Sequence, residues 1–426
     1  MNPLSIFCLV AILATATTVC GRSNSIRDNL KPTEWISQRE LENTPSVDEI
    51  TFERLQEMPA EEAAELVNKI YHLSQLSRKI EPSYAPSPSD IPAYTYTPTG
   101  QRVNFKLNQL VSTAQQQPHF GQQEVTIFIT GLPQQKLRDA ANANQKLVQA
   151  YLQAYNGQVQ VQGGQDYDYV QDTSSSEESS SRSNNQQNTP TGNLVVIDLG
   201  AVIRNFEELA LLDINRVGAA IGNSLVQLTS QTNVPQEVIY IVAQGIGAHV
   251  AGAAARQYTR QTGNTLRRIT AMDPTKVFAR KPNTLVGLSR GNADFVDAIH
   301  TSAYGFGTAA RVGDVDFYPN GPSVAMPGTD DIIEASLRAT RYFAETMRPG
   351  NDRNFPAVAA ESLQQYKNNN GNGRRAYMGI AADYDLEGDY ILQVNGKSPF
   401  GKSAPAKKQN SYHGLHQTSG RTSTNN

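Results

Sequence analysis

The sequence predicts an α/β fold, in which helices flank a mostly parallel central sheet. Short apolar runs with β-branched residues recur at Glu124–Thr130, Leu194–Leu199, Val238–Val242 and Leu266–Met272, and such runs are typical of buried strands. Helical segments are expected between them, because alternating strands and helices build right-handed βαβ units with parallel strands. The 426 residues are enough for one large domain of this class with appendages.

The first 20 residues are expected to be a cleavable secretory signal. An apolar run up to Leu13 is followed by Ala14-Thr15-Ala16, and the run is too short to cross a bilayer. We therefore expect a secreted protein without a membrane span. The two cysteines, Cys8 and Cys20, lie within this segment or at its end, so no internal disulfide is expected in the mature chain. The formal net charge of −3 gives no nucleic-acid footprint.

Residues 21–100 are expected to form a helical extension followed by a linker. Pro59 and the acidic residues after it open a helix. Its apolar positions recur every three or four residues, at Ala63, Leu66, Val67, Ile70, Leu73 and Leu76. Such a stripe is a docking face, either for this chain or for a partner chain. Residues 81–100 are rich in proline and are expected to be an extended linker.

The main domain is expected to span 101–403, with helices from about Gln134 to Tyr155 and from Asp213 to Gln227, and residues 404–426 are expected to be a disordered tail. An acidic, serine-rich segment interrupts the domain at 157–192, and its composition predicts a disordered surface insert. Acidic neighbours favour sulfation of Tyr167 and Tyr169 and phosphorylation of Ser174, Ser175, Ser176, Ser179 and Ser180. An unmodified solvated linker is the alternative.

The run Val238–Gly252 has the pattern of a strand, a sharp glycine-rich turn and a helix of small residues. This is the context of the nucleophile elbow of α/β-hydrolases, whose pattern is G-x-S-x-G. Here the turn reads Ala243-x-Gly245-x-Gly247, with glycine in place of the nucleophile. No Ser or Cys lies between Ile239 and Thr259 to replace it. The alternative is an ordinary βα turn that never carried an active site.

Several motifs in the same order resemble those of the neutral lipases and secreted phospholipases A1 of the pancreatic-lipase group. Besides the elbow helix, the matching segments are Ile269–Pro274, Phe295–Thr301, Asp316–Gly321, Met378–Asp383 and Gly388–Gly396. Together they span roughly Asn104 to Phe400. The resemblance implies a lipase-like α/β-hydrolase domain.

Carried over residue by residue, the resemblance implies a degenerate triad at Gly245, Asp273 and Ser336. Gly245 stands for the nucleophile, Asp273 keeps the carboxylate, and Ser336 stands where the family has its histidine. No histidine occurs between His300 and His413, so we expect no catalytic residues. The oxyanion-hole stretch corresponds to Thr130-Gly131-Leu132, with backbone donors expected at Leu132 and Ile246.

No metal and no cofactor are expected. The family's calcium-loop positions correspond to Thr284, Gly287, Ser289 and Asn292. None of these is a carboxylate, whereas a hard divalent cation prefers several carboxylate or carbonyl oxygens. His249, one turn into the elbow helix, is expected to be a packed and hydrogen-bonded core residue.

The altered triad, the scarce cysteines and the acidic insert together resemble one branch of this group, the yolk proteins (vitellogenins) of higher flies. The resemblance implies a secreted storage protein that oocytes take up through an endocytic receptor. It also implies tyrosine sulfation and serine phosphorylation, no lipase activity and association with other yolk protein chains. The emptied cleft is a candidate site for a lipid or a steroid conjugate.

Two other functions stay open at this stage. One is an active secreted lipase or phospholipase with an unconventional nucleophile. The other is a receptor ligand that is recognised through its sulfated insert. Abundance separates storage from signalling, because a nutrient must be a major component of the egg.

Overall fold

The computed structural model describes residues 44–76, 81–156, 192–280, 285–322, 325–368 and 372–403. The expected signal at 1–20, the tail at 404–426 and every expected sulfation and phosphorylation site lie outside these ranges. So does the expected acidic insert, except for Gly192, which begins a strand.

The described residues form one sheet of eleven strands in the order β10-β9-β11-β8-β7-β6-β5-β3-β4-β1-β2. The seven strands from β11 to β4 run parallel to their neighbours, and antiparallel strands extend the sheet at both edges. The bounds are β1 Pro92–Tyr96, β2 Arg102–Lys106, β3 Glu124–Ile129, β4 Gly192–Ile197, β5 Ile239–Gln244, β6 Arg268–Met272, β7 Phe295–Ile299, β8 Val315–Pro319, β9 Pro356–Ala359, β10 Arg375–Tyr377 and β11 Gly388–Leu392.

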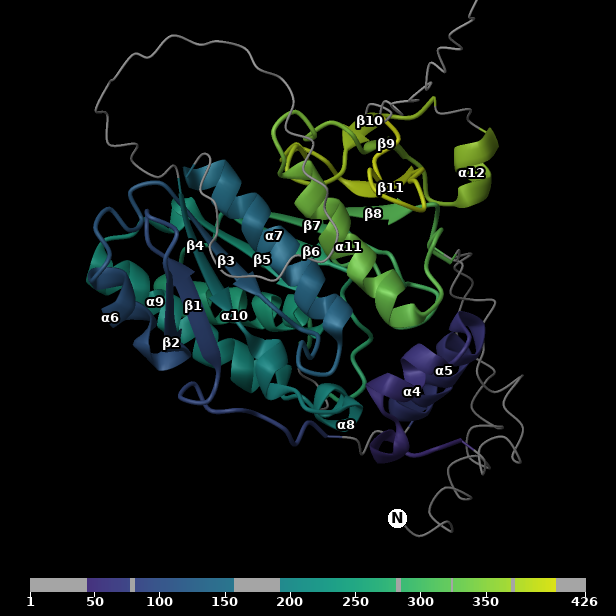
Figure 1. Ribbon diagram of the computed structural model, residues 1–426, viewed down its shortest axis with the longest axis horizontal. Helices are drawn as coiled ribbons and strands as arrows, with labels where there is room; N and C mark the ends of the chain where they lie inside the picture. Colours follow the sequence, from purple (N-terminus) through teal and green to yellow (C-terminus); the bar gives the residue numbers. More distant parts are fainter. Residues whose placement is uncertain are drawn as a thin grey trace, which may run out of the picture.

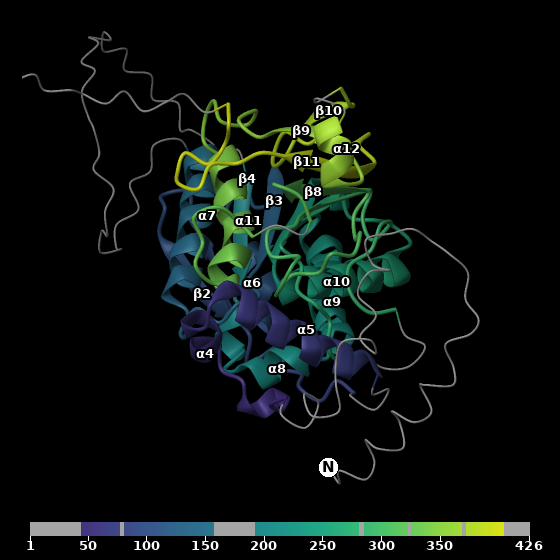
Figure 2. The same ribbon diagram turned by 90° about the vertical axis from the view of Figure 1, so that its right-hand side faces the viewer.

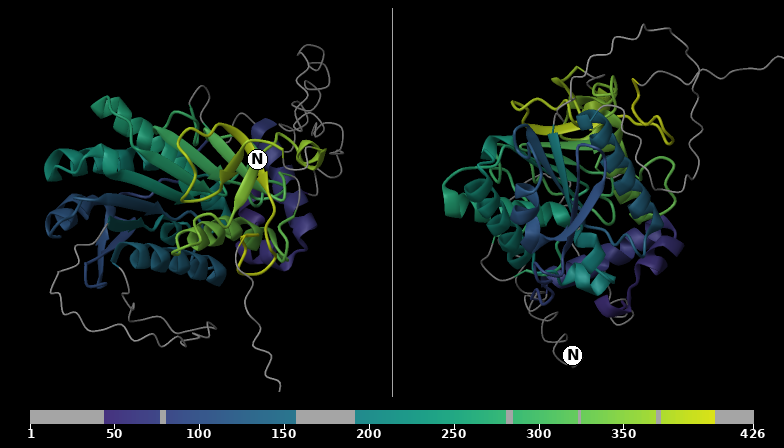
Figure 3. Two further views of the ribbon diagram at one scale, coloured as in Figure 1. Left: turned by 90° about the horizontal axis from the view of Figure 1, so that it is seen from above. Right: turned by 60° about the vertical axis from the view of Figure 1, so that its left-hand side comes forward.

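Helices cover both faces of this sheet, as the view from above in Figure 3 shows. Helices α9 and α10 pack on one face, and α7 and α11 pack on the other. The helices are α4 Phe52–Glu57, α5 Ala60–Leu76, α6 Leu110–Gln115, α7 Arg138–Asn156, α8 Phe206–Ala210, α9 Ile214–Thr232, α10 Ile246–Thr262, α11 Ile332–Thr346 and α12 Leu363–Asn368. The α/β class expected from the sequence is confirmed.

Side chains alternate between the two cores along the strands, as the pleat requires. In β3, Val125, Ile127 and Ile129 belong to the core under α9 and α10, whereas Phe128 belongs to the core under α7 and α11. Both faces are therefore apolar, which explains why these strands appear in the sequence as continuous apolar runs.

The linker expected over 81–100 is corrected by the structure, because it contributes strand β1. Ala93, Tyr94 and Thr95 are buried, and β1 pairs with both β2 and β4. The boundary expected at residue 101 therefore falls in the turn of a β-hairpin. Proline is tolerated here because Pro92 stands at the first position of its strand.

The apolar stripe of the N-terminal extension docks within its own chain. Ala63, Val67 and Ile70 on α5 are buried in the same core as α9 and α10. Figures 1 and 2 show α4 and α5 in purple, beside α8 at one end of the molecule. Over the ranges that the structure describes, no helix combines the length and the apolar character needed to cross a membrane.

Candidate functional site

The turn between β5 and α10 has the backbone of a nucleophile elbow. Gly245 caps α10 with a φ of +58° and a ψ of −125°, and its N–H donates to Met272 O at 3.0 Å. A Cβ built on Gly245 would lie 3.5 Å from Thr275 Cγ2, 3.7 Å from Leu132 Cγ and 3.9 Å from the carbonyl carbon of Gly131. These are ordinary contacts, so the position has room for a Cβ. Only the backbone conformation favours glycine here.

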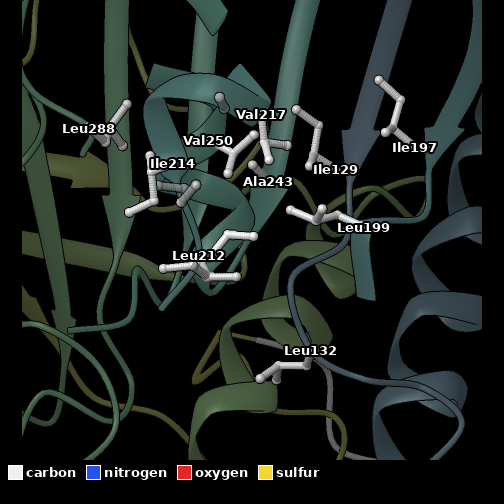
Figure 4. Close-up of a cluster of buried hydrophobic side chains, with 14 of the residues drawn as sticks. Ile129, Leu132, Ile197, Leu199, Leu212, Ile214, Val217, Ala243, Val250 and Leu288 are labelled. Atoms are coloured by element: carbon white, nitrogen blue, oxygen red, sulfur yellow. The ribbon is translucent and has the colours of Figure 1, made fainter. Parts of the chain in front are cut away.

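The neighbouring glycines are required by close packing. A Cβ on Gly131 would lie 2.0 Å from Gln244 O and 2.9 Å from Ile246 N, and one on Gly247 would lie 2.9 Å from Ile129 O. The stretch that corresponds to the oxyanion hole therefore lies directly against the elbow. Figure 4 shows Leu132 at the lower edge of the buried cluster that also contains Ala243 and Val250. Leu132 is fully buried and places an apolar side chain beside the nucleophile position.

Asp273 lies at the end of β6, the strand next to β5, in a left-handed conformation with φ +49°. Its Oδ1 accepts hydrogen bonds from the N–H groups of Thr301 and Ser302, each at 2.8 Å, and its Oδ2 accepts one from Ser302 Oγ at 2.5 Å. The carboxylate is fully buried. It therefore ties the end of β6 to the loop after β7, and no local sequence pattern indicates this role for Thr301 and Ser302.

Ser336 lies in the second turn of α11, whose first turn is capped by Asp331. The residue is fully buried, and its Oγ has no hydrogen-bond partner among the described residues. Its carbonyl oxygen accepts a hydrogen bond from Thr301 Oγ1 at 3.3 Å. The fold thus connects Ser336 to Asp273 through Thr301, but it places the expected base position inside a packed helix.

The two histidines on elements beside the elbow have both ring nitrogens engaged. His249 Nε2 lies 2.7 Å from Thr275 O and its Nδ1 accepts from Leu288 N–H at 3.0 Å. Burial lowers the pKa of His249 to about 4, although the hydrogen bond to Thr275 O opposes this. His249 is therefore a neutral core residue at physiological pH, as its position in the elbow helix predicts.

His300 follows β7 and lies 2.7 Å from Asp316 Oδ1 through Nε2 and 2.9 Å from Thr308 O through Nδ1. Burial lowers the pKa of His300, but the hydrogen bond and the charge of Asp316 outweigh burial, and the net shift is upward. The ring also stacks on Tyr318 with centroids 4.7 Å apart. His300 is thus held as a structural partner of Asp316.

Thr275 lies beside the nucleophile position, with its Cγ2 3.5 Å from a Cβ built on Gly245. Its Oγ1 is buried without a hydrogen-bond partner among the described residues. A threonine nucleophile needs a base within hydrogen-bond reach, but His249 points its Nε2 at the carbonyl of Thr275 rather than at the hydroxyl. The geometry therefore supplies no nucleophile–base pair at Thr275.

A buried lysine lies close to Asp273. Lys276 Nζ donates to the carbonyl oxygens of Gly305 and Gly307, the latter at 2.6 Å. Burial lowers the pKa of Lys276 to about 7, against the opposing effect of the Asp273 charge. This lysine was not predicted as a functional residue, because nothing in its local sequence pattern distinguishes it from an exposed lysine.

The residues at the calcium-loop positions do not fit a divalent cation. Arg256 Nη1 on α10 donates to Gly287 O at 2.6 Å and to Asn292 Oδ1 at 3.0 Å, and Asn292 Oδ1 also accepts from Ser289 N–H. A guanidinium therefore uses the oxygens that a metal would need. Thr284 lies outside the described residues, and over the described ranges no three His, Cys, Asp or Glu side chains gather in a group able to hold a metal.

Comparison with known proteins places this site in a family. A family profile described as Lipase matches residues 99–400. Vitellogenin-2 of Ceratitis capitata is 82% identical over 421 residues, covering 99% of this chain and 100% of that relative. Vitellogenin-1 of Ceratitis capitata is 57% identical over 98% of both chains, and Vitellogenin-3 of Drosophila melanogaster is 51% identical over 96% of this chain and 98% of its own. The chain belongs to the lipase family and, within it, to the vitellogenins, the yolk proteins of flies.

Proposed function

We propose that this chain is a secreted egg-yolk storage protein that oocytes take up as nutrient for the embryo, and that its lipase fold does not hydrolyse esters. The full-length similarity to the vitellogenins supports the storage role, and the observation that carries the lack of hydrolysis is Gly245. It stands at the elbow where a lipase needs a hydroxyl, with room for a side chain that the sequence does not provide. Loss of the nucleophile costs serine hydrolases on the order of 10⁶ in turnover.

The surroundings of Gly245 support the same proposal. Asp273 has its oxygens engaged by Thr301 and Ser302, so it orients a loop rather than a histidine. His249 and His300 are committed to other partners. Backbone N–H groups at the elbow can still donate hydrogen bonds, but an oxyanion hole without a nucleophile and a base catalyses little.

Storage is tested by following the protein through egg development. The purified chain, labelled with a fluorophore and injected into the haemolymph of egg-laying females, is expected to accumulate in oocytes and to disappear during embryogenesis. Serum albumin of equal concentration is the control for bulk uptake. Exclusion of the labelled chain from oocytes, or a minor share in total egg protein, would contradict storage.

Uptake through an oocyte receptor and association with other yolk protein chains belong to the same proposal. Sulfation at Tyr167 and Tyr169 and phosphorylation of the five serines between Ser174 and Ser180 named above would add negative charge to an already acidic segment. Intact-mass measurement of protein from eggs, before and after phosphatase, tests the modifications. A mass equal to that of the unmodified mature chain would contradict them.

A bound lipid or steroid conjugate is a further part of this proposal. The cavity between β1, β4 and α7 is lined by Tyr96, Leu152 and Leu194 and encloses about 10 Å³, enough for one water, so it is not a ligand site. Native protein from eggs, extracted and analysed by mass spectrometry, is expected to release a lipophile in stoichiometric amount. Protein that releases none would contradict the carrier role.

A further inference from the structure

Tyr384 is the tyrosine that the fold presents to solvent. It lies in the turn between β10 and β11 and is 49% exposed. Every other tyrosine in the described ranges is buried or half-buried. Asp383 and Asp385, on either side of it, are exposed as well. Of the described tyrosines, Tyr384 is therefore the most accessible to a modifying enzyme.

The sequence around Tyr384 repeats the acidic pattern of the insert. Residues 383–385 read Asp-Tyr-Asp, as do residues 166–168, and Glu387 adds a third carboxylate to the turn. Acidic neighbours are the feature that favours sulfation of Tyr167 in the insert. Tyr390 also has an acidic neighbour, Asp389, but it is only 1% exposed. Only Tyr384 among the described tyrosines thus combines the acidic pattern with exposure.

A guanidinium lies on the hydroxyl of Tyr384. Arg267 Nε donates to Tyr384 Oη at 3.0 Å, and Arg267 Nη2 donates to Glu124 Oε2 at 2.6 Å. The Tyr384 ring packs on that of Phe295, with centroids 5.0 Å apart and an angle of 33° between the planes. The phenol oxygen is thus held beside a cation. Arginine binds oxyanions through charge-assisted hydrogen bonds, so Arg267 is placed to bind an anionic group attached to this oxygen.

Two of the carboxylates in the turn have cations of their own. Arg374 Nη2 donates to Asp385 Oδ2 at 2.7 Å, and Arg290 Nη2 donates to Glu387 Oε1. These ion pairs lower the repulsion that a further negative charge on Tyr384 would meet, since like charges placed together destabilise a modified segment.

We propose that Tyr384 is sulfated as the chain passes through the secretory pathway, and that Arg267 binds the sulfate. The inference rests on the proposed secretion, and it adds a site on the folded domain to those expected in the acidic insert. The phenol oxygen of Tyr384 attacks the sulfur of a nucleoside phosphosulfate, and the bond between sulfur and the phosphate oxygen breaks. The phenolic proton passes to a base of the sulfotransferase, and the nucleotide leaves as the free phosphate. The product is a sulfate ester with a permanent negative charge.

The test identifies the modified tyrosine in protein secreted by a fly cell line. Trypsin cleaves after Arg375 and Lys397 and releases one peptide that contains Tyr377, Tyr384 and Tyr390. We expect this peptide to carry one SO₃ group that phosphatase does not remove. Acetylation of the free tyrosine hydroxyls, followed by removal of the sulfate with acid, should leave Tyr384 as the one unacetylated tyrosine of the peptide.

Tyr390 is the internal control, because it has an acidic neighbour but is buried. A secreted chain whose peptide carries no sulfate would overturn the inference and leave the proposed secretion standing. Sulfate on Tyr377 or Tyr390 instead of Tyr384 would also overturn it, because exposure would then not select the site. Failure of the chain to reach the medium would contradict the proposed secretion and the inference with it.

The role of Arg267 is measured by the rate at which arylsulfatase releases sulfate from the folded protein. In a chain with Tyr167→Phe and Tyr169→Phe, we expect Arg267→Gln to speed this release about threefold, the factor that a partly exposed ion pair supplies. Arg374→Gln is the control, because Arg374 pairs with Asp385 in the same turn, and it should release sulfate at the parental rate. Equal rates in the two variants would show that Arg267 does not bind the sulfate.

Discussion

The nucleophile position and the base position of the candidate site are packed differently. On the nucleophile side the shape of an enzyme remains, because Gly245 keeps the elbow conformation and a Cβ there would meet no atom closer than 3.5 Å. At the base position, by contrast, Ser336 is fully buried inside α11. The nucleophile position thus has room for a Cβ, whereas the base position lies inside a packed helix. We therefore expect a serine at position 245 and a histidine at position 336 to cost different amounts of stability.

The conformation of the elbow depends on the glycines beside Gly245, because a Cβ at Gly131 or Gly247 would clash with backbone atoms. We expect Gly131→Ala to destabilise the fold by more than about 4 kcal/mol, because the added Cβ would lie 2.0 Å from Gln244 O, a clash with backbone that cannot move aside. Chemical denaturation measures the loss. Gly263→Ala is the control, since nothing lies within 4 Å of a Cβ at Gly263 and only its positive φ, which Gly131 lacks, would strain the new residue. A loss at Gly131 no larger than at Gly263 would show that the elbow is not closely packed.

The packing at the base position is tested with Ser336→His. We expect a loss of about 3 kcal/mol, because an imidazole overfills a fully buried helical position. Ser336→Ala should change the free energy of unfolding by less than about 0.5 kcal/mol, since the hydroxyl has no partner to lose among the described residues. Thermal unfolding of both variants makes the comparison. Full stability of Ser336→His would show that α11 has room for a base.

The matching change on the nucleophile side is Gly245→Ser. Its expected cost is about 1–2 kcal/mol, because the position has room and only the backbone conformation is strained for a residue with a Cβ. Gly245→Ala should cost the same, since strain and not the hydroxyl is responsible. If Gly245→Ser proved as costly as Gly131→Ala, the elbow would not have kept its shape.

A smaller effect on stability is expected from His249, which is neutral because burial lowers its pKa. Its pKa is lowered to about 4 in the folded chain against about 6.5 in the unfolded chain, so the unfolded state binds the proton first as the pH falls. Stability is therefore complete above pH 6.5 and declines toward pH 4, with a loss of about 1 kcal/mol between pH 7.5 and 5.5. His249→Gln, which can keep both hydrogen bonds, should remove this part of the pH dependence.

The control for the pH experiment is His119→Asn. His119 is exposed and has a positive φ, which asparagine tolerates. Urea midpoints measured every half pH unit should show the parental slope in His119→Asn and a flatter one in His249→Gln. Equal slopes in the parent and in His249→Gln would contradict a depressed pKa at His249.

Features with a local sequence signature could be predicted, and features made by distant contacts could not. The alternation of apolar runs and helical segments predicted the parallel sheet, and the glycines at 245 and 247 predicted the elbow. Strand β1 was missed because the prolines in and around it resemble a linker, while its pairing with β4 depends on residues a hundred positions away. For the same reason the sequence could not predict the hydrogen-bond partners of Asp273 or the contacts of α5 with the loops after β6 and β7. These contacts join residues that are far apart in the sequence.

The central claim is that no side chain at this site attacks a carbonyl, and labelling the parent protein tests it most directly. The purified chain is incubated with a fluorophosphonate and, separately, with a short-chain ester. The account predicts hydrolysis at the uncatalysed rate and no covalent adduct on any residue by peptide mass spectrometry. Ester turnover above background that is lost on Asp273→Asn, with an adduct on a residue of the site such as Thr275, would contradict it.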